Sequence, residues 1–182
     1  VTSLLAEIDQ TVVGPIATTA GLVVELGGWL AAIYPFVEGT EPDIDDEADV
    51  RRMAAAMANL HRSLDQLGST DLPLVAALAA TEPATHGLET GRLQLLHGDF
   101  SPKNLLFSDR HVRVIDFDEC GYGTVEFEVG NTLYMVLFDA AMSSDLQRYG
   151  RFRSWFVEEY RSASGHGLAD ELIDEAIGIR IG

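Results

Sequence analysis

Three short apolar runs, separated by polar turns, constrain this chain more than any other feature. They read RLQLLH (92–97), NLLF (104–107) and VRVIDF (112–117). Runs of this length bounded by turn residues predict short strands. The turn after the first run is unusually polar, with His97, Asp99 and Asn104 close together in it. Polar groups packed between apolar runs need partners, so these side chains either bond one another or meet a ligand.

A long helix is predicted ahead of this region, over residues 45–67. Its apolar residues, beginning with Val50, recur at helical spacing and form one stripe that also includes His61. Acidic residues crowd its N-terminal end, where the helix dipole favours them, and Gly68 ends it. We interpret His61 as a core histidine whose ring nitrogens are hydrogen-bonded, not as a ligand.

Helical spacing and turn residues predict the other elements. The N-terminal part reads as the end of a helix and then a hairpin around Gly27-Gly28, a pair that accepts positive φ. Trp29 and Trp155 are interpreted as core residues. The predicted segments are a helix end at 1–10, a hairpin at 21–36, a polar linker at 37–49, and helices at about 72–80, 126–142, 145–163 and 168–178.

The charge of the chain excludes some partners. Its 29 acidic and 12 basic residues give a formal net charge of −17, which argues against nucleic acid because phosphate backbones need basic patches. The negative charge also permits a cationic substrate, although we favour solubility as the explanation of the charge. No apolar run reaches the length of a membrane span and no leader is visible, so we expect a cytoplasmic protein without a membrane partner.

The predicted β unit brings several oxygen donors together. A strand, a turn and a paired strand would place Asn104 and Asp116 at the same end of the β unit, with Asp118 two residues further on. An amide oxygen and carboxylates suit Mg²⁺, which keeps waters and nucleotide phosphates as its other ligands. Asp99 could then accept a proton from an attacking hydroxyl, while His97 holds the loop from inside. Taken one at a time, these residues are also common in turns that bind nothing.

Together, HGDFSPKN (97–104) and VIDFDECGYG (114–123) resemble the catalytic and metal-binding loops of the aminoglycoside phosphotransferase and choline kinase-like family. IYPFVEG (33–39) resembles the family's hinge, and MANLHRSL (57–64) resembles its first long C-lobe helix. The resemblance implies an α+β, protein-kinase-like fold. Its C-lobe would be mainly helical with a small β insertion, and a residual piece of the β-rich N-lobe would precede it.

The resemblance also implies roles for individual residues. Asp99 would be the catalytic base, and Asn104 and Asp116 would bind Mg²⁺. The carbonyl of Pro35 and the amide of Val37 would hold the base of ATP or GTP, which is possible because proline keeps its carbonyl. His97, Asp118 and Lys103 would support the site, and Glu128 is interpreted as a structural helix cap.

The chain departs from the family in one respect. We find no glycine-rich phosphate loop and no N-lobe lysine, since Lys103 is the only lysine. We therefore expect residues 1–36 to be a partial N-lobe with a hinge at about 33–39, and 37–182 to be a C-lobe, incomplete at both termini. Alone, we expect this chain to be inactive, and residues 1–36 to be poorly ordered or paired with another chain.

Three functions remain open at this point. The first is transfer of a phosphoryl group from ATP to a hydroxyl of a small molecule such as an aminocyclitol, amino alcohol or sugar. The second is a bacterial-type protein serine/threonine kinase, and the third is a catalytically dead binding module. Acidic residues near the predicted cleft suit an aminated small molecule and favour the first; they are Asp118, Glu119 and Glu126.

Overall fold

The computed structural model describes residues 1–68, 72, 92–109 and 111–181. Helices dominate it, and its strands form three separate two-stranded antiparallel sheets within the described ranges. In chain order the elements are α1 (Thr2–Ile8), β1 (Val23–Leu26), β2 (Trp29–Ala32), α2 (Glu47–Gln66), β3 (Gln94–Leu96), the 3₁₀ turn η3 (Pro102–Asn104), β4 (Leu105–Phe107), β5 (Val112–Val114), β6 (Gly121–Gly123), α4 (Val125–Met142), α5 (Leu146–Ser164) and α6 (Asp170–Ile181).

These elements confirm the expected α+β class, with a helical lobe that carries a small β unit. Every predicted segment in the described part of the chain has a counterpart within a few residues. The helix predicted over 72–80 lies outside the described residues, apart from Leu72. The strand β6, which pairs with β3, was not predicted because its sequence GYG has no apolar alternation.

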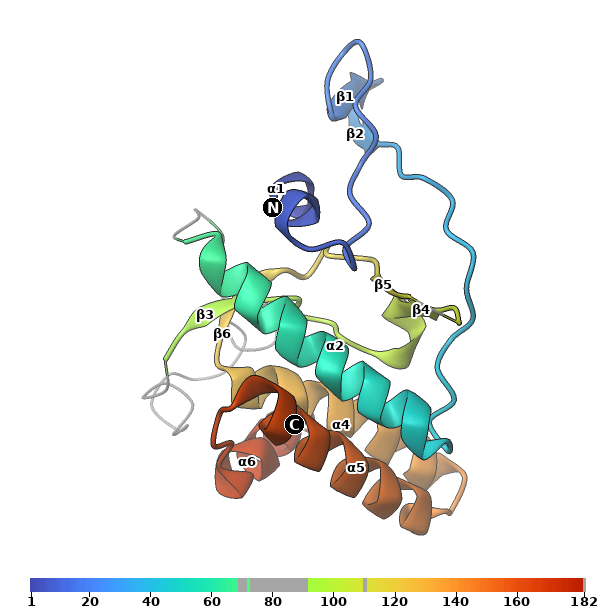
Figure 1. Ribbon diagram of the computed structural model, residues 1–182, viewed down its shortest axis with the longest axis vertical. Coiled ribbons are helices and arrows are strands. Elements are labelled where there is room, and N and C mark those ends of the chain that lie inside the picture. Colours follow the sequence, from blue (N-terminus) through green and yellow to red (C-terminus); the bar gives the residue numbers. More distant parts are fainter. Residues whose placement is uncertain (69–71, 73–91, 110, 182) are drawn as a thin grey trace.

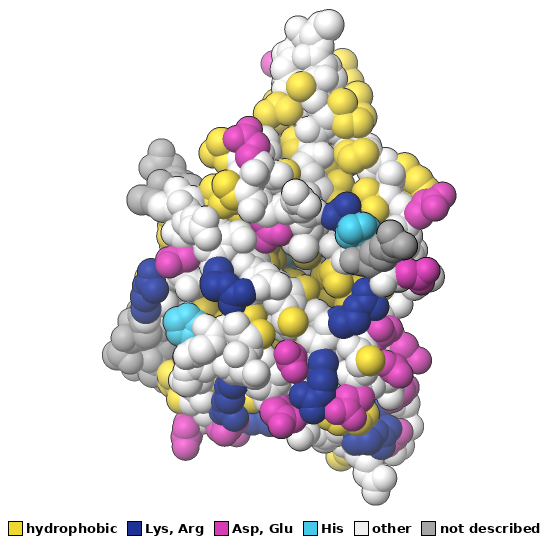
Figure 2. Space-filling model, viewed as in Figure 1, with side chains coloured by type: hydrophobic (Ala, Val, Ile, Leu, Met, Phe, Trp, Pro, Cys, Tyr) yellow, Lys and Arg dark blue, Asp and Glu magenta, His cyan; other side chains and the backbone are white. Residues whose placement is uncertain are grey.

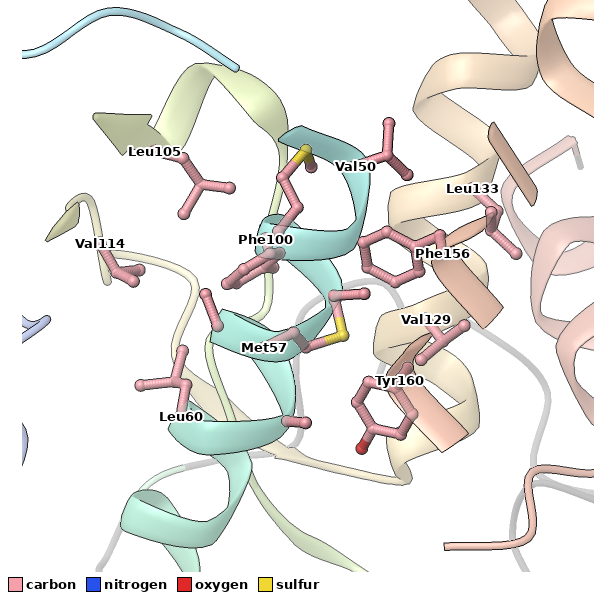
Figure 3. Close-up of a cluster of buried hydrophobic side chains, with 14 of the residues drawn as sticks. Val50, Met57, Leu60, Phe100, Leu105, Val114, Val129, Leu133, Phe156 and Tyr160 are labelled. Carbon is pink, nitrogen blue, oxygen red and sulfur yellow. The ribbon is translucent and has the colours of Figure 1, made fainter. Parts of the chain in front are cut away.

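The helix α2 is the centre of the helical lobe (Figure 1). It begins at the cap Asp46, whose side chain accepts a hydrogen bond from the amide of Asp49. Its apolar stripe packs against α5, while α4 packs against both α5 and α6. Figure 3 shows Met57 of α2 pointing toward Phe156 and Tyr160 of α5, while Leu60 lies on the opposite side of α2.

The core also includes the β unit and part of the N-terminal segment. Leu105 of β4 and Val114 of β5 are paired and completely buried. Val12 forms a bridge to Val114, and Leu5 of α1 is buried in the same cluster. The first residues of the chain therefore pack onto the helical lobe, and the small sheet is fixed between them and α2.

The hairpin β1–β2 projects away from the rest of the molecule, as the upper part of Figures 1 and 2 shows. Its turn is the predicted one, since Gly27 and Gly28 have φ values of 60° and 86°. The interpretation of Trp29 as a core residue is wrong, because its side chain is 79% exposed. Trp29 is exposed because no described helix or strand packs over the hairpin. Trp155 is half-buried against the core, as expected.

Candidate active site

The β4–β5 hairpin brings the predicted metal ligands to one end of the β unit. Asn104 immediately precedes β4, and Asp116 lies two residues after β5. The amide of Ile115 donates to the carbonyl of Asn104 over 3.1 Å. The two runs therefore pair as the sequence predicts, and Asn104 stands beside the residue that precedes Asp116.

The side chains of Asp99 and Asn104 are joined directly. The amide nitrogen of Asn104 donates to the Asp99 carboxylate over 3.0 Å and to the Asp99 carbonyl over 2.8 Å. Both bonds use the amide nitrogen, which leaves the amide oxygen as the acceptor that a cation could use. Asn104 thus orients the carboxylate of Asp99 and still has a hard oxygen donor to offer.

His97 links the Asp99 loop to the Asp116 loop from inside. Its side chain is fully buried, as predicted. Its Nε2 lies 2.9 Å from the carbonyl of Ile115, and its Nδ1 accepts from the amide of Asp99 over 3.3 Å. Since a carbonyl only accepts and an amide only donates, the ring is neutral with its proton on Nε2. Burial lowers the pKa of His97 and keeps it in this form.

Backbone conformation supports both loops. Asp116 has a φ of 64°, a left-handed conformation that aspartate tolerates better than most residues. Gly98 has a φ of 88°, and a Cβ there would collide with the carbonyl oxygen of Glu119. Only glycine lets the two loops approach this closely.

A cleft of about 750 Å³ lies beside this unit and gathers four of the predicted residues. Pro35 and Val37 line it from the hinge segment, and Asp116 and Asp118 line it from the loop after β5. Leu106 and Ile115, among others, supply its apolar wall. Asp99 and Asn104 are outside its lining.

A second cleft of about 520 Å³ lies next to η3. Lys103 lines this second cleft and not the first, and its side chain is exposed. The acids Glu41 and Asp43 also border it. Asp139 does too, but it is paired with Arg148 over 2.7 Å.

Glu128 makes contacts with the Asp99 loop that the sequence did not predict. It is not a helix cap: Thr124 caps α4 by accepting from the amide of Phe127. Glu128 is 1% exposed, and its Oε1 accepts from the amide of Gly98 over 2.5 Å. Its Oε2 accepts from the amide of His97 over 3.3 Å and lies 2.5 Å from Nε2 of His61. The carboxylate therefore holds the start of the Asp99 loop.

The charge state of Glu128 follows from these partners. Burial alone would raise its pKa, but the hydrogen bond from His61 and the amide of Gly98 together lower it. His61 is buried with both ring nitrogens bonded, as expected. A signal was available in the sequence: Glu128 and His61 are both polar residues on apolar helix faces, and such residues need each other or a backbone partner.

Two negative findings concern the described residues. No three His, Cys, Asp or Glu side chains among them come together as a metal site. None of their helices combines the length and the apolar character that a membrane span requires.

Sequence comparison shows the family. The model of the phosphotransferase enzyme family matches residues 68–166, more than half of the chain, and includes both loops of the site. The chain belongs to this family, which confirms the resemblance seen in the motifs. No curated protein matches.

Similar solved structures show the same kinase-like fold. An amicoumacin kinase in complex with AMP-PNP, Ca²⁺ and Ami superposes with a TM-score of 0.75 at 17% identity, over 98% of this chain and 64% of that one. For an aminoglycoside-3'-phosphotransferase of type VIII the TM-score is 0.57 at 22% identity, over 98% of this chain and 76% of that one. For a microcompartment-associated aminopropanol kinase the TM-score is 0.51 at 19% identity, over 98% of this chain and 76% of that one. The chain thus spans about two thirds to three quarters of the length of these proteins.

Proposed function

We propose that the protein transfers the γ-phosphate of ATP to a hydroxyl group of a small, aminated molecule. The observation that carries the proposal is the Asp99–Asn104 pair, which the β unit holds next to Asp116 and beside a cleft. In protein kinases a carboxylate of this kind accepts the hydroxyl proton, and an amide oxygen and a second carboxylate hold Mg²⁺.

The first cleft is the proposed nucleotide site. Its volume of about 750 Å³ lies within the range of small-molecule pockets. The hinge residues Pro35 and Val37 offer a backbone carbonyl and a backbone amide, which together match the acceptor and donor edge of adenine. The similar amicoumacin kinase was solved with AMP-PNP, which supports a nucleotide in this fold.

The proposed metal is Mg²⁺, held by the amide oxygen of Asn104 and the carboxylate of Asp116. The donor set fits, since both groups are hard oxygen donors and the amide nitrogen of Asn104 is already used by Asp99. Asp118, exposed on the same cleft, would contribute from further out. A bound Mg²⁺ would neutralise charge on the phosphates during transfer.

Asp99 is the proposed general base. As the acceptor oxygen forms its bond to the γ-phosphorus, the bond to the departing ADP breaks and the hydroxyl proton passes to the Asp99 carboxylate. Asn104 fixes the orientation of that carboxylate through the 3.0 Å bond. His97 and Glu128 do not touch the reactants in this proposal, and they hold the loop that carries Asp99 in place.

The second cleft is the proposed acceptor site. It lies against η3, which begins three residues after Asp99, and the acids Glu41 and Asp43 border it together with Lys103. An amino group on the acceptor would be attracted by these carboxylates and by the overall charge of −17. Amicoumacin, aminoglycoside and aminopropanol kinases share the fold, which supports an aminated acceptor here.

A binding module without catalysis is the second candidate. Lys103 is the only lysine, and it borders the second cleft, so the sequence provides no lysine for the phosphates in the first. In both candidates, residues 1–36 with the hinge at about 33–39 form part of an N-lobe, and residues 37–182 form the C-lobe.

Titration calorimetry and a transfer assay test the proposal together. The protein at its full natural length is titrated with Mg·ATP and Mg·GTP, and transfer from radiolabelled ATP is measured with aminoglycosides, amino alcohols and a generic protein as acceptors. Transfer to an amine-bearing alcohol that Asp99→Asn abolishes would support the proposal. Nucleotide binding without transfer would favour the binding module. Labelling of the generic protein acceptor and of no small molecule would favour a protein kinase. The absence of nucleotide binding would overturn the assignment of the first cleft.

A further inference from the structure

The hydroxyl group of Tyr160 extends the hydrogen-bonded chain that starts at the Asp99 loop. Tyr160 lies on α5 and is completely buried. Its hydroxyl oxygen is 2.6 Å from Nδ1 of His61, and the two rings meet edge to face at 5.6 Å. Because His61 is on α2 and Glu128 is on α4, this chain of contacts connects three helices to the loop.

The direction of each hydrogen bond follows from the groups that take part. Glu128 accepts two backbone amides and is held as a carboxylate, so it can only accept from His61. His61 therefore carries a proton on Nε2. A neutral ring that carries this proton has an acceptor at Nδ1, and the group within reach of Nδ1 in the described contacts is the Tyr160 hydroxyl. Burial raises the pKa of Tyr160, so that hydroxyl keeps its proton and donates it.

A tyrosine is otherwise unexpected at this place. Phe152 and Phe156 fill the same buried face of α5 with rings that carry no polar group. A buried hydroxyl costs free energy unless it is hydrogen-bonded, so phenylalanine would serve packing at least as well. What the hydroxyl adds is the bond to His61.

We propose that Tyr160 is a positioning residue for the Asp99 loop. Its hydroxyl bonds Nδ1 of His61 and so holds the ring in the orientation in which Nε2–H donates to Glu128, and the oriented carboxylate then holds the amides of His97 and Gly98. Calling this loop catalytic rests on the proposed function, but the positioning role itself is a property of the folded chain.

The test uses the variant Tyr160→Phe, which removes one oxygen atom and keeps the ring. Its matched control is Tyr149→Phe, which removes a hydroxyl from the same helix, about three turns before Tyr160, where it contacts Arg153. Amide hydrogen exchange is followed by NMR at Gly98 and, as a reference for global unfolding, at Leu133 within α4. We expect Gly98 to exchange about fivefold faster in Tyr160→Phe relative to the reference, the change that corresponds to one lost hydrogen bond. Tyr149→Phe should leave the ratio unchanged.

Equal acceleration at Gly98 and Leu133 in Tyr160→Phe would show a purely structural role and overturn the proposal. A second measurement needs no variant: the ¹⁵N chemical shifts of the His61 ring in the unmodified chain report its tautomer. We expect a protonated Nε2 and an unprotonated Nδ1, and the opposite tautomer would overturn the proposal even if Tyr160→Phe failed to fold. Neither readout involves nucleotide or acceptor, so failure here is distinct from failure of the proposed phosphotransferase activity.

Discussion

The amide of Gly98 donates to the buried carboxylate of Glu128 across 2.5 Å, although the two residues are 30 positions apart in the sequence. The loop that carries Asp99 is therefore held by a side chain of α4, in addition to its own turn. Because the carboxylate is completely enclosed, any change in its charge or orientation must move the loop or leave a buried polar group without its partner.

Substitution of Gly98 by alanine should disrupt this arrangement. The residue has a φ of 88°, and a Cβ would collide with the carbonyl of Glu119. We expect a loss of about 2–4 kcal/mol in the free energy of unfolding, from strain and from displacement of the loop after β5. Urea denaturation monitored by circular dichroism measures it. Gly150→Ala is the control, because that glycine lies in α5 with no atom within 4 Å of its added Cβ. It should gain up to about 1 kcal/mol, and a Gly98→Ala variant as stable as the original would contradict the contact.

Replacing Glu128 by glutamine should destabilise the chain in a manner that depends on pH. The pKa of Glu128 is lowered in the folded state, so its contribution is complete above its ordinary value of 4.5 and is lost as the pH falls through the folded pKa. Glu128→Gln forces an amide NH₂ against backbone amides or against His61. At pH 7 we expect a loss of about 2–4 kcal/mol.

The difference in the free energy of unfolding between the original chain and Glu128→Gln should become smaller as the pH is lowered below 4.5. The reason is that a protonated Glu128, like the amide of glutamine, carries no charge to stabilise its partners. Chemical denaturation of both proteins at several pH values measures how this difference changes with pH. The contributions of the other acidic residues cancel, because both proteins contain them. A difference that stays constant or widens toward acid pH would show that Glu128 is not held as a carboxylate.

Asp116→Asn should weaken metal-dependent nucleotide binding selectively. The substitution removes the proposed anionic ligand, while asparagine still tolerates the φ of 64°. We expect affinity for Mg·ATP to fall at least about tenfold and affinity for adenosine to stay nearly unchanged, since adenosine needs no metal. Calorimetric titration with both ligands measures the effect. Asp118→Asn is the comparison, with a smaller expected loss, and equal losses for both ligands would indicate a disturbed fold and not lost coordination.

Asp99→Ala should abolish most of the turnover in any form of the protein that catalyses transfer. Loss of a general base lowers kcat by roughly 10²–10⁴-fold, and nucleotide affinity should change little because Asp99 is outside the lining of the first cleft. Steady-state kinetics with the best acceptor provides the measurement. Asp109→Ala removes an exposed acid after β4 and serves as the control. Near-normal turnover in Asp99→Ala would refute its assignment as the base.

Local sequence patterns predicted the elements and the pairing within the β unit. The period of the apolar stripe from Val50 onward defines α2, and the pairing of NLLF with VRVI brings Asn104 beside Ile115, the residue before Asp116. Both depend on interactions between residues close in the chain, so periodicity and turn residues are sufficient. The gathering of Pro35, Val37, Asp116 and Asp118 in one cleft was implied by the family motifs, and only the structure shows it.

The sequence by itself determined the helical and strand segments, the polar turns between them and the protein family. Only the tertiary structure decided the partners of Glu128, the place of Lys103 in the second cleft and the exposure of Trp29. Glu128, His61 and Tyr160 come from three helices, and nothing local sets the distances between their atoms. Those distances depend on how α2, α4 and α5 pack, because a buried polar group takes whichever partner the packed core brings within hydrogen-bond reach.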